Sequence, residues 1–164
     1  MSHSNIYVVH KSGHYNKEKA EKITPERLKR EIEYADGCWE LTKNEDILGG
    51  LKWLDDYIYE TYNHHLWAIE VDAKARRITI DEEFKRFYKE ALYERWFDAI
   101  GDIDDGETLC DKEEDIKDFF RPMGGLRIAT VDDYYGLNVQ TLDKGLASLE
   151  PGVYEIERIF DYHY

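Results

Sequence analysis

The chain has few of the residues on which cross-linked scaffolds depend. Its 164 residues include only two cysteines, Cys38 and Cys110, and three prolines. One disulfide is the most that can form, so a disulfide-stapled fold is excluded, and a reduced chain in the cytoplasm is the expectation. The first residues have neither a basic start nor an apolar run after it, so no secretory signal is predicted.

Long apolar runs and excess basic charge are also missing. No stretch approaches the roughly 18 apolar residues of a membrane span, so we expect no membrane contact. Lys and Arg total 22 against 36 Asp and Glu, which gives a net charge of −14. Such a charge repels nucleic-acid phosphates, so direct nucleic-acid binding is not expected. It favours instead a protein target with a basic surface.

What the chain does have is apolar and aromatic side chains. The hydrophobic fraction is 42%, with six Phe, four Trp and thirteen Tyr. This content excludes wholesale disorder. A chain of this length buries about two-thirds of its unfolded surface, so a single domain over residues 1–164 is predicted.

The order of local patterns predicts an α+β fold with a central bent, mainly antiparallel sheet and flanking helices. Residues 37–42 are interpreted as a turn. Strands are predicted at residues 5–10, 66–71, 77–80, 126–131, 137–142 and 153–160. Helices are predicted at residues 24–34, from 44 onward, 81–100, 111–120 and 143–149.

Several common sites can be dismissed from the sequence. No glycine-rich phosphate loop or Gly-x-Ser-x-Gly segment is present. Residues 102–113 start like a calcium loop, but Gly106 comes one position early for the required turn. The adjacent His64 and His65 would point to opposite faces of a strand. A metalloenzyme is therefore not predicted.

Four segments in order resemble the ADP-ribosyltransferase superfamily, over roughly residues 5 to 150. They are Val-His-Lys-Ser at 9–12, Gly-Cys-Trp-Glu-Leu-Thr at 37–42 before a Trp-bearing helix, Leu-Trp-Ala-Ile-Glu-Val-Asp at 66–72, and Thr-Leu-Asp-Lys-Gly-Leu-Ala-Ser-Leu at 141–149. The layout also resembles small ADP-ribosyltransferases that inhibit bacterial CRISPR defence, which implies a phage or mobile-element inhibitor. The chain departs from the family pattern because no Glu-x-Glu or Gln-x-Glu precedes residues 137–142.

The resemblance implies an NAD-dependent transferase that modifies a protein, and it suggests a role for particular residues. Asp132 or Asp133 would stabilise the cationic transition state of nicotinamide release. His10 would bind the adenosine-side ribose with support from Ser12. Trp39 would stack on nicotinamide, and Thr42 would fix its amide. Each of these residues also has a purely structural explanation. His10 suits a strand end, Trp39 suits a core position, and Asp132 and Asp133 suit a turn.

The alternative hypothesis is a non-enzymatic acidic inhibitor or adaptor that binds a basic, nucleic-acid-handling protein. Its evidence is the net charge and the ten carboxylates within residues 98–118. A solvated surface explains the same run, because most charge runs are solvated.

Overall fold

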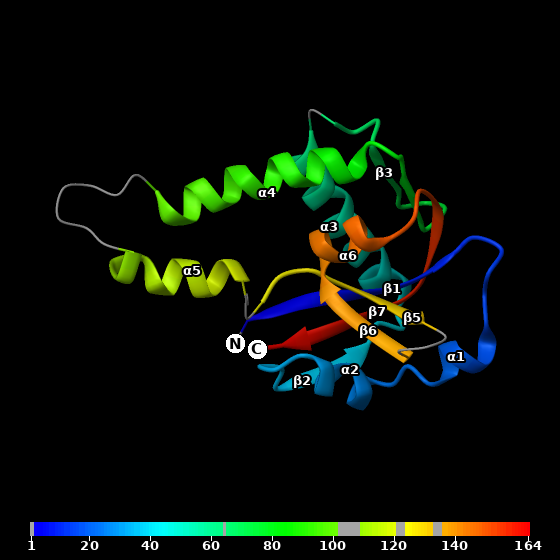
Figure 1. The fold of residues 1–164 in the computed structure, drawn as a ribbon. Helices are drawn as coiled ribbons and strands as arrows, with labels where there is room; N and C mark the ends of the chain where they lie inside the picture. Colours follow the sequence, from blue (N-terminus) through cyan, green and yellow to red (C-terminus); the bar gives the residue numbers. More distant parts are fainter. Residues whose placement is uncertain (1, 64, 102–108, 121–123, 133–135) are drawn as a thin grey trace.

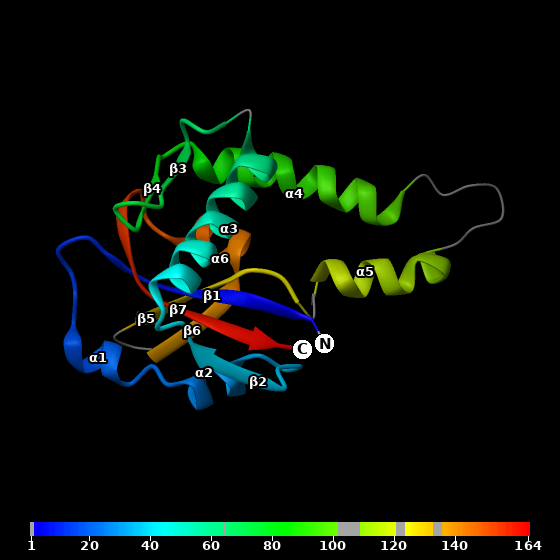
Figure 2. The same cartoon turned by 180° about the vertical axis from the view of Figure 1, so that it is seen from behind.

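A mixed sheet of seven strands forms the centre of the molecule, and helices lie against both of its faces (Figures 1 and 2). The computed structural model describes residues 2–63, 65–101, 109–120, 124–132 and 136–164. The strands are β1 (His3–Lys11), β2 (Gly37–Glu40), β3 (Ile69–Asp72), β4 (Arg77–Ile80), β5 (Arg127–Asp132), β6 (Gly136–Thr141) and β7 (Gly152–His163). The helices are α1 (Lys17–Glu21), α2 (Pro25–Glu31), α3 (Asn44–Tyr62), α4 (Phe84–Ile100), α5 (Glu113–Phe120) and α6 (Leu142–Ser148), with a 3₁₀ turn at Leu109–Lys112.

The long strand β7 organises the sheet. One of its edges pairs with β1 along nearly its whole length, from His3 opposite His163 to Lys11 opposite Tyr154. Its other edge pairs with β2 near the end of the chain and with β4 near the start of β7. The order is therefore β3-β4-β7-β1-β5-β6, with β2 on the same edge as β4. Of the pairs between described strands, β1–β5 is parallel and the others are antiparallel.

Alternation along β1 divides the core between the two faces of the sheet. Tyr7 and Val9 belong to a cluster that α3, α4 and α6 cover, and Ile6 and Val8 belong to a second cluster beneath the α1–α2 segment. Successive side chains of a strand point to opposite faces. A β1 that is buried on both sides therefore needs a helical layer on each side.

The long helices form where the sequence predicts them. Thr24 caps α2 by accepting a hydrogen bond from the Arg27 N–H, and Pro25 occupies the first helical position. Helix α3 buries Leu51, Leu54 and Ile58, which recur at helical spacing. The α+β class and the single domain are confirmed.

A buried polar cluster joins the helices of one layer. Asp143, in the first turn of α6, accepts hydrogen bonds from the Tyr57 and Tyr62 hydroxyls of α3 and from Arg95 of α4. Its carboxylate thus links three helices. Burial raises the pKa of both tyrosines, and the adjacent Asp143 charge adds to this effect.

Three local expectations were wrong, one of them the strand predicted at residues 66–71, which begins only at Ile69 as β3. Residues 37–40 form the strand β2 rather than part of a turn, because their backbone pairs with β7 from Gly37 opposite His163 to Glu40 opposite Phe160. A strand of four residues is too short to show the alternation of apolar and polar side chains from which strands are predicted. The helix predicted at residues 24–34 ends earlier, at Glu31.

Candidate functional site

The candidate site lies where two neighbouring parallel strands separate. β1 and β5 pair from Ile6 opposite Arg127 to Val8 opposite Ala129, and within the described residues the pairing goes no further although both strands continue. Their carboxyl ends therefore diverge. Ligand sites of open sheets are commonly found outside the carboxyl ends of strands, where the connections lead away from each other.

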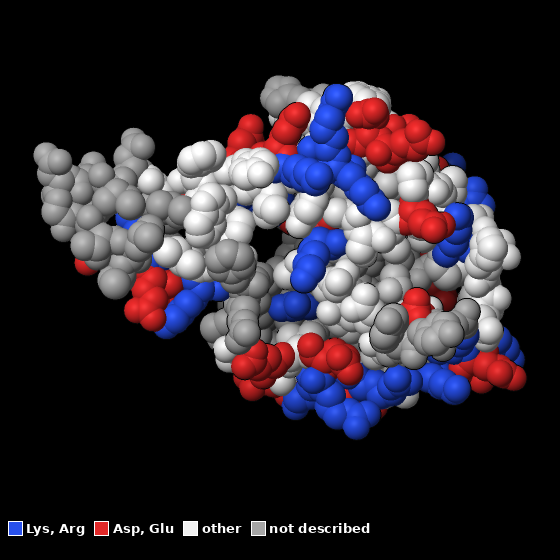
Figure 3. Space-filling model, viewed as in Figure 1, with Lys and Arg blue, Asp and Glu red and all other residues white. Residues whose placement is uncertain are grey.

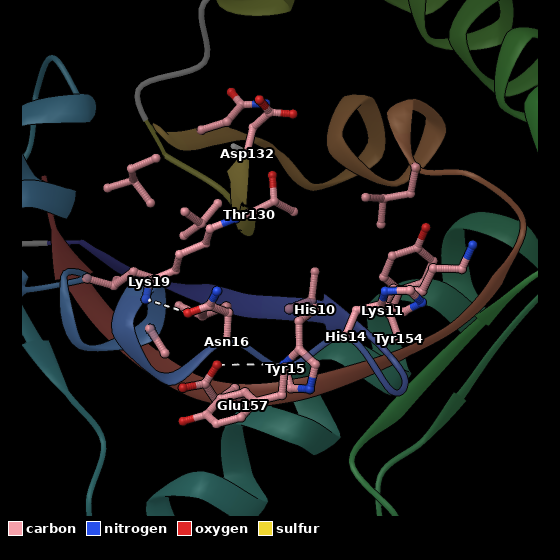
Figure 4. A pocket seen from close by; sticks show the side chains of 18 of the residues that line it. His10, Lys11, His14, Tyr15, Asn16, Lys19, Thr130, Asp132, Tyr154 and Glu157 are labelled. Carbon is pink, nitrogen blue, oxygen red and sulfur yellow. Dashed lines mark hydrogen bonds and ion pairs between the residues drawn. The ribbon is translucent and has the colours of Figure 1, made fainter. Parts of the chain in front are cut away.

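A pocket of about 1040 Å³ occupies this wedge. The end of β1, the following α1 segment, the end of β5, the start of β6, the first half of β7 and the residues around the end of α6 all contribute to it (Figure 4). Its polar lining residues are His10, Lys11, His14, Tyr15, Asn16, Lys19, Thr130, Asp132, Asn138, Ser148, Glu150, Tyr154 and Glu157. The volume is at the upper end of the range of about 300–1,000 Å³ that small-molecule pockets occupy.

His10 is held between two carboxylates of β7. Its Nε2 lies 3.1 Å from Glu155 Oε2, and its Nδ1 lies 3.6 Å from Glu157 Oε2. The Tyr15 ring packs over the imidazole with 5.1 Å between the ring centroids. In the described part of the chain, Nδ1 is buried and has no hydrogen-bond partner. This nitrogen is shielded from solvent and faces the Glu157 carboxyl.

A β-bulge places Arg158 on the same face of the sheet as the two carboxylates. Val8 pairs with Arg158 whereas Val9 pairs with Ile156, so Glu157 is an extra residue in β7. Glu157 and Arg158 consequently reach the same face of the sheet, where Glu157 meets His10 and Arg158 reaches the α1 segment. Bulges commonly redirect a side chain next to an active site.

Burial gives Glu157 an unusual protonation behaviour. Desolvation raises the pKa of this carboxyl above its ordinary value of 4.5, and the charges of His10 and Arg158 only partly oppose the effect. A carboxyl with a raised pKa, next to a histidine and inside a pocket, is a candidate acid or base.

Arg158 fixes the wall of the pocket on the α1 side. Its guanidinium donates two hydrogen bonds to Glu40 of β2, at 2.8 and 2.7 Å, and others to the carbonyls of Ala20 and Ile23. These hydrogen bonds from Arg158 hold the pKa of Glu40 below its ordinary value. Because Ala20 and Ile23 line the pocket, the arginine connects β2 and β7 to its rim.

The structure brings together some of the residues that the sequence singled out. His10 and Asp132 line the same pocket from β1 and β5 (Figure 4). Ser12 follows β1, and its N–H donates to the Val153 carbonyl. Asp133 lies outside the described residues.

Trp39 and Thr42 lie elsewhere. Trp39 pairs with Asp161 and its ring lies 4.3 Å from that of His163, near the opposite end of β1 from His10. Thr42 lines a smaller pocket of about 310 Å³ that shares Glu157 and Arg158 as lining residues. Neither residue lines the main pocket.

Sequence analysis missed Glu155 and Glu157. The signal was present, because the predicted strand at 153–160 carries these carboxylates two positions apart, on one face. By itself, a strand with two carboxylates on one face suggests that this face is exposed to solvent. Only the pairing of β7 with β1 shows that both carboxylates reach His10.

The acidic run at 98–118 is described only in part. Asp98, Asp111, Glu113 and Glu114 are exposed, and Glu113 pairs with Lys117 at 2.9 Å. Asp102, Asp104, Asp105 and Glu107 lie outside the described residues. The prediction of an exposed acidic recognition surface stays a prediction.

No protein-family model, curated protein or solved structure matches this chain. Among the described residues, no helix is both long enough and apolar enough to cross a membrane.

Proposed function

We propose that the pocket between β1 and β5 binds NAD and that the chain transfers ADP-ribose to a protein target. The observation that carries the proposal is that His10 and Asp132, from distant parts of the sequence, line one pocket large enough for a dinucleotide. The resemblance of segments 9–12, 37–42, 66–72 and 141–149 to ADP-ribosyltransferases supplies the substrate and the reaction.

The chemistry requires a negative charge beside the ribose that loses nicotinamide. As the bond between ribose C1′ and the pyridinium nitrogen breaks, its electron pair goes to nicotinamide, and the ribose becomes an oxocarbenium-like cation. A fixed carboxylate stabilises that cation in the transition state. Asp132 performs this role, and a nucleophilic side chain of the target then bonds to C1′ and gives up its proton.

His10 and Glu157 bind the sugar hydroxyls on the opposite wall. Glu155 orients the imidazole through Nε2, and Nδ1 faces the Glu157 carboxyl at the pocket wall. Desolvation raises the pKa of Glu157 above its ordinary value, and its carboxyl oxygens can accept hydrogen bonds from the sugar hydroxyls. Tyr15, rather than the distant Trp39, supplies an aromatic ring beside His10.

The chain also has a Glu-x-Glu, although at a different place from the family pattern. It is Glu155-Ile156-Glu157, in the last strand rather than ahead of residues 137–142. Both of its carboxylates flank His10, so the acid that the family pattern requires has a candidate in the pocket.

Calorimetric titration with NAD and a transfer assay with labelled NAD test the proposal. We expect His10→Ala to weaken NAD binding by at least tenfold. Asp132→Asn should lower transfer by at least a hundredfold while NAD binding stays within about threefold. Asp98→Asn, on the exposed face of α4, is the matched control and should change neither quantity. Absence of NAD binding by the unaltered chain would reject the proposal.

The alternative is an acidic protein that binds a basic partner without chemistry. It predicts association that weakens with rising salt and needs no NAD. Basic side chains also gather on the surface, at the lower edge in Figure 3, over α2, whose last turn carries Lys29 and Arg30. The described surface therefore displays both signs of charge, which gives no support to the alternative beyond the net charge.

A further inference from the structure

A second cluster of side chains with ligand chemistry lies at the opposite end of β1 from His10. It comprises His3 of β1 together with Asp161 and His163 of β7. His3 pairs directly with His163, and Asp161 is two residues before His163 on the same strand. Strand alternation and antiparallel pairing therefore place all three side chains on one face of the sheet, the face that α3 covers.

The distances suit a single small cation. His3 Nδ1 lies 3.2 Å from Asp161 Oδ1, and His163 Nε2 lies 3.5 Å from Asp161 Oδ2. One ligand atom from each of the three residues lies within 4.8 Å of the others. With metal–ligand bonds of about 2.0–2.2 Å, neighbouring ligands of a tetrahedral zinc ion are about 3.4 Å apart. Small side-chain rotations would therefore bring all three onto one ion.

Part of the cluster is already held in place by the fold. The side chains of Asp161 and His163 are only 15% and 23% exposed, whereas that of His3 is 60% exposed. Two ligands thus lie on a paired strand, and His3 approaches from the solvent side. Coordinating side chains that are already ordered lose less conformational entropy when an ion binds.

Two tryptophans flank the cluster. The Trp39 ring lies 4.3 Å from that of His163, and the Trp53 ring of α3 lies 6.1 Å from that of His3. Trp39 reaches this place because Gly37 leaves room for it: a Cβ at Gly37 would lie 2.7 Å from the indole. The two indoles provide an optical probe of the site.

We propose that His3, Asp161 and His163 bind one divalent transition-metal ion of the zinc class. Two imidazoles and one carboxylate are a ligand set for zinc or for other late first-row metals rather than for calcium or magnesium. Three protein ligands leave at least one coordination position for water or for a group of a bound molecule. The site is separate from the NAD pocket and does not depend on it.

Metal titration of the protein purified without a polyhistidine tag and freed of metal by chelation tests the proposal. We expect Zn²⁺ to bind with a stoichiometry of one by calorimetry and to raise the melting temperature. Co²⁺ should bind at the same place, give the visible absorption of a low-coordinate cobalt ion and quench tryptophan emission. Zn²⁺ should then displace Co²⁺ and restore the emission.

Variants distinguish the site from adventitious binding. Asp161→Asn and His163→Gln should each weaken Zn²⁺ binding at least tenfold, because even changes next to the ligands cost about 10- to 100-fold in affinity. His14→Gln, an exposed histidine beyond the other end of β1, is the matched control and should leave the affinity unchanged. Circular dichroism confirms that each variant is folded.

Two results would overturn the proposal. Absence of saturable Zn²⁺ and Co²⁺ binding by the unaltered chain would mean that the three residues form ion pairs only. Binding that survives Asp161→Asn and His163→Gln would place the ion elsewhere.

Discussion

Glu157 shows how a single inserted residue changes the chemistry of a strand. Without the bulge, the Arg158 side chain would point to the opposite face of the sheet from Glu155 and Glu157. With it, the guanidinium lies on the face that carries both carboxylates, and its charge partly opposes the desolvation that raises the pKa of Glu157. This one residue therefore couples the backbone irregularity to the electrostatics of the pocket.

The raised pKa of Glu157 predicts a pH-dependent effect on stability. The folded protein holds the proton of this carboxyl more tightly than the unfolded chain does, so Glu157 lowers the free energy of unfolding as the pH rises from below 4.5 through its folded-state pKa. Glu157→Gln removes this dependence. We expect the variant to gain stability relative to the unaltered protein across that window, as measured by urea unfolding between about pH 4 and pH 8.

The exposed Glu150 provides the control for this measurement. Glu150→Gln removes an exposed carboxylate and is measured over the same pH range. A difference in unfolding free energy between Glu157→Gln and the unaltered protein that does not change with pH would show that the Glu157 carboxyl titrates alike in the folded and unfolded states.

At the scale of elements, the two adjacent glycines of α3 have different environments. Gly50 faces β1 and β7: its carbonyl accepts a hydrogen bond from the Tyr7 hydroxyl at 2.7 Å, and a Cβ would lie 3.1 Å from Asn5 Nδ2 and 3.3 Å from Ile159 Cδ1. A Cβ on Gly49 would meet nothing within 4 Å. Only Gly50 allows the helix to approach the sheet this closely.

We therefore expect opposite effects from two alanine substitutions. Gly49→Ala should stabilise the protein by about 0.5–1 kcal/mol, because alanine favours the helix. Gly50→Ala should destabilise it by about 1 kcal/mol or more, because its neighbours are buried and closely packed. Urea unfolding measures both, and an equal gain from the two substitutions would contradict the close approach.

Elements with long periodic patterns were predictable, and elements that depend on distant partners were not. The spacing of Leu51, Leu54 and Ile58 defines α3 because the period of a helix is visible in the sequence itself. β2 has only four residues, and its state depends on β7, more than a hundred residues away. The same reasoning applies to the site: His10 and Asp132 could be proposed from strand ends, whereas the approach of Glu157 to His10 depends on the pairing of β1 with β7, two strands far apart in the sequence.

At the scale of the whole molecule, the two described ends of the chain lie side by side (Figure 1). The Ser2 N–H donates to the Tyr164 carbonyl at 3.3 Å, and the Tyr164 N–H donates to the Ser2 carbonyl at 3.0 Å. The sheet is therefore continuous across the two ends, and a short linker could join them.

This arrangement predicts that the chain tolerates circular permutation. A permutant with the ends joined and a new opening between Lys74 and Ala75, in the exposed β3–β4 turn, should fold and unfold cooperatively. Opening the chain between Asp143 and Lys144 is the contrasting variant. It cuts α6 at the carboxylate that joins three helices, so we expect loss of cooperativity in urea unfolding followed by circular dichroism. Loss of the fold in both variants would contradict the prediction.

The antiparallel pairing of β1 and β7 also determines how the protein responds to mechanical force. Because His3 lies opposite His163, a pull on the two ends of the chain acts across the first pair of the ladder and not along the strands. The hydrogen bonds then carry the load one after another, from that pair toward Lys11 and Tyr154. The sheet unzips from its terminal edge under a small tension, whereas a pull between Lys11 and His163 would shear the same hydrogen bonds together.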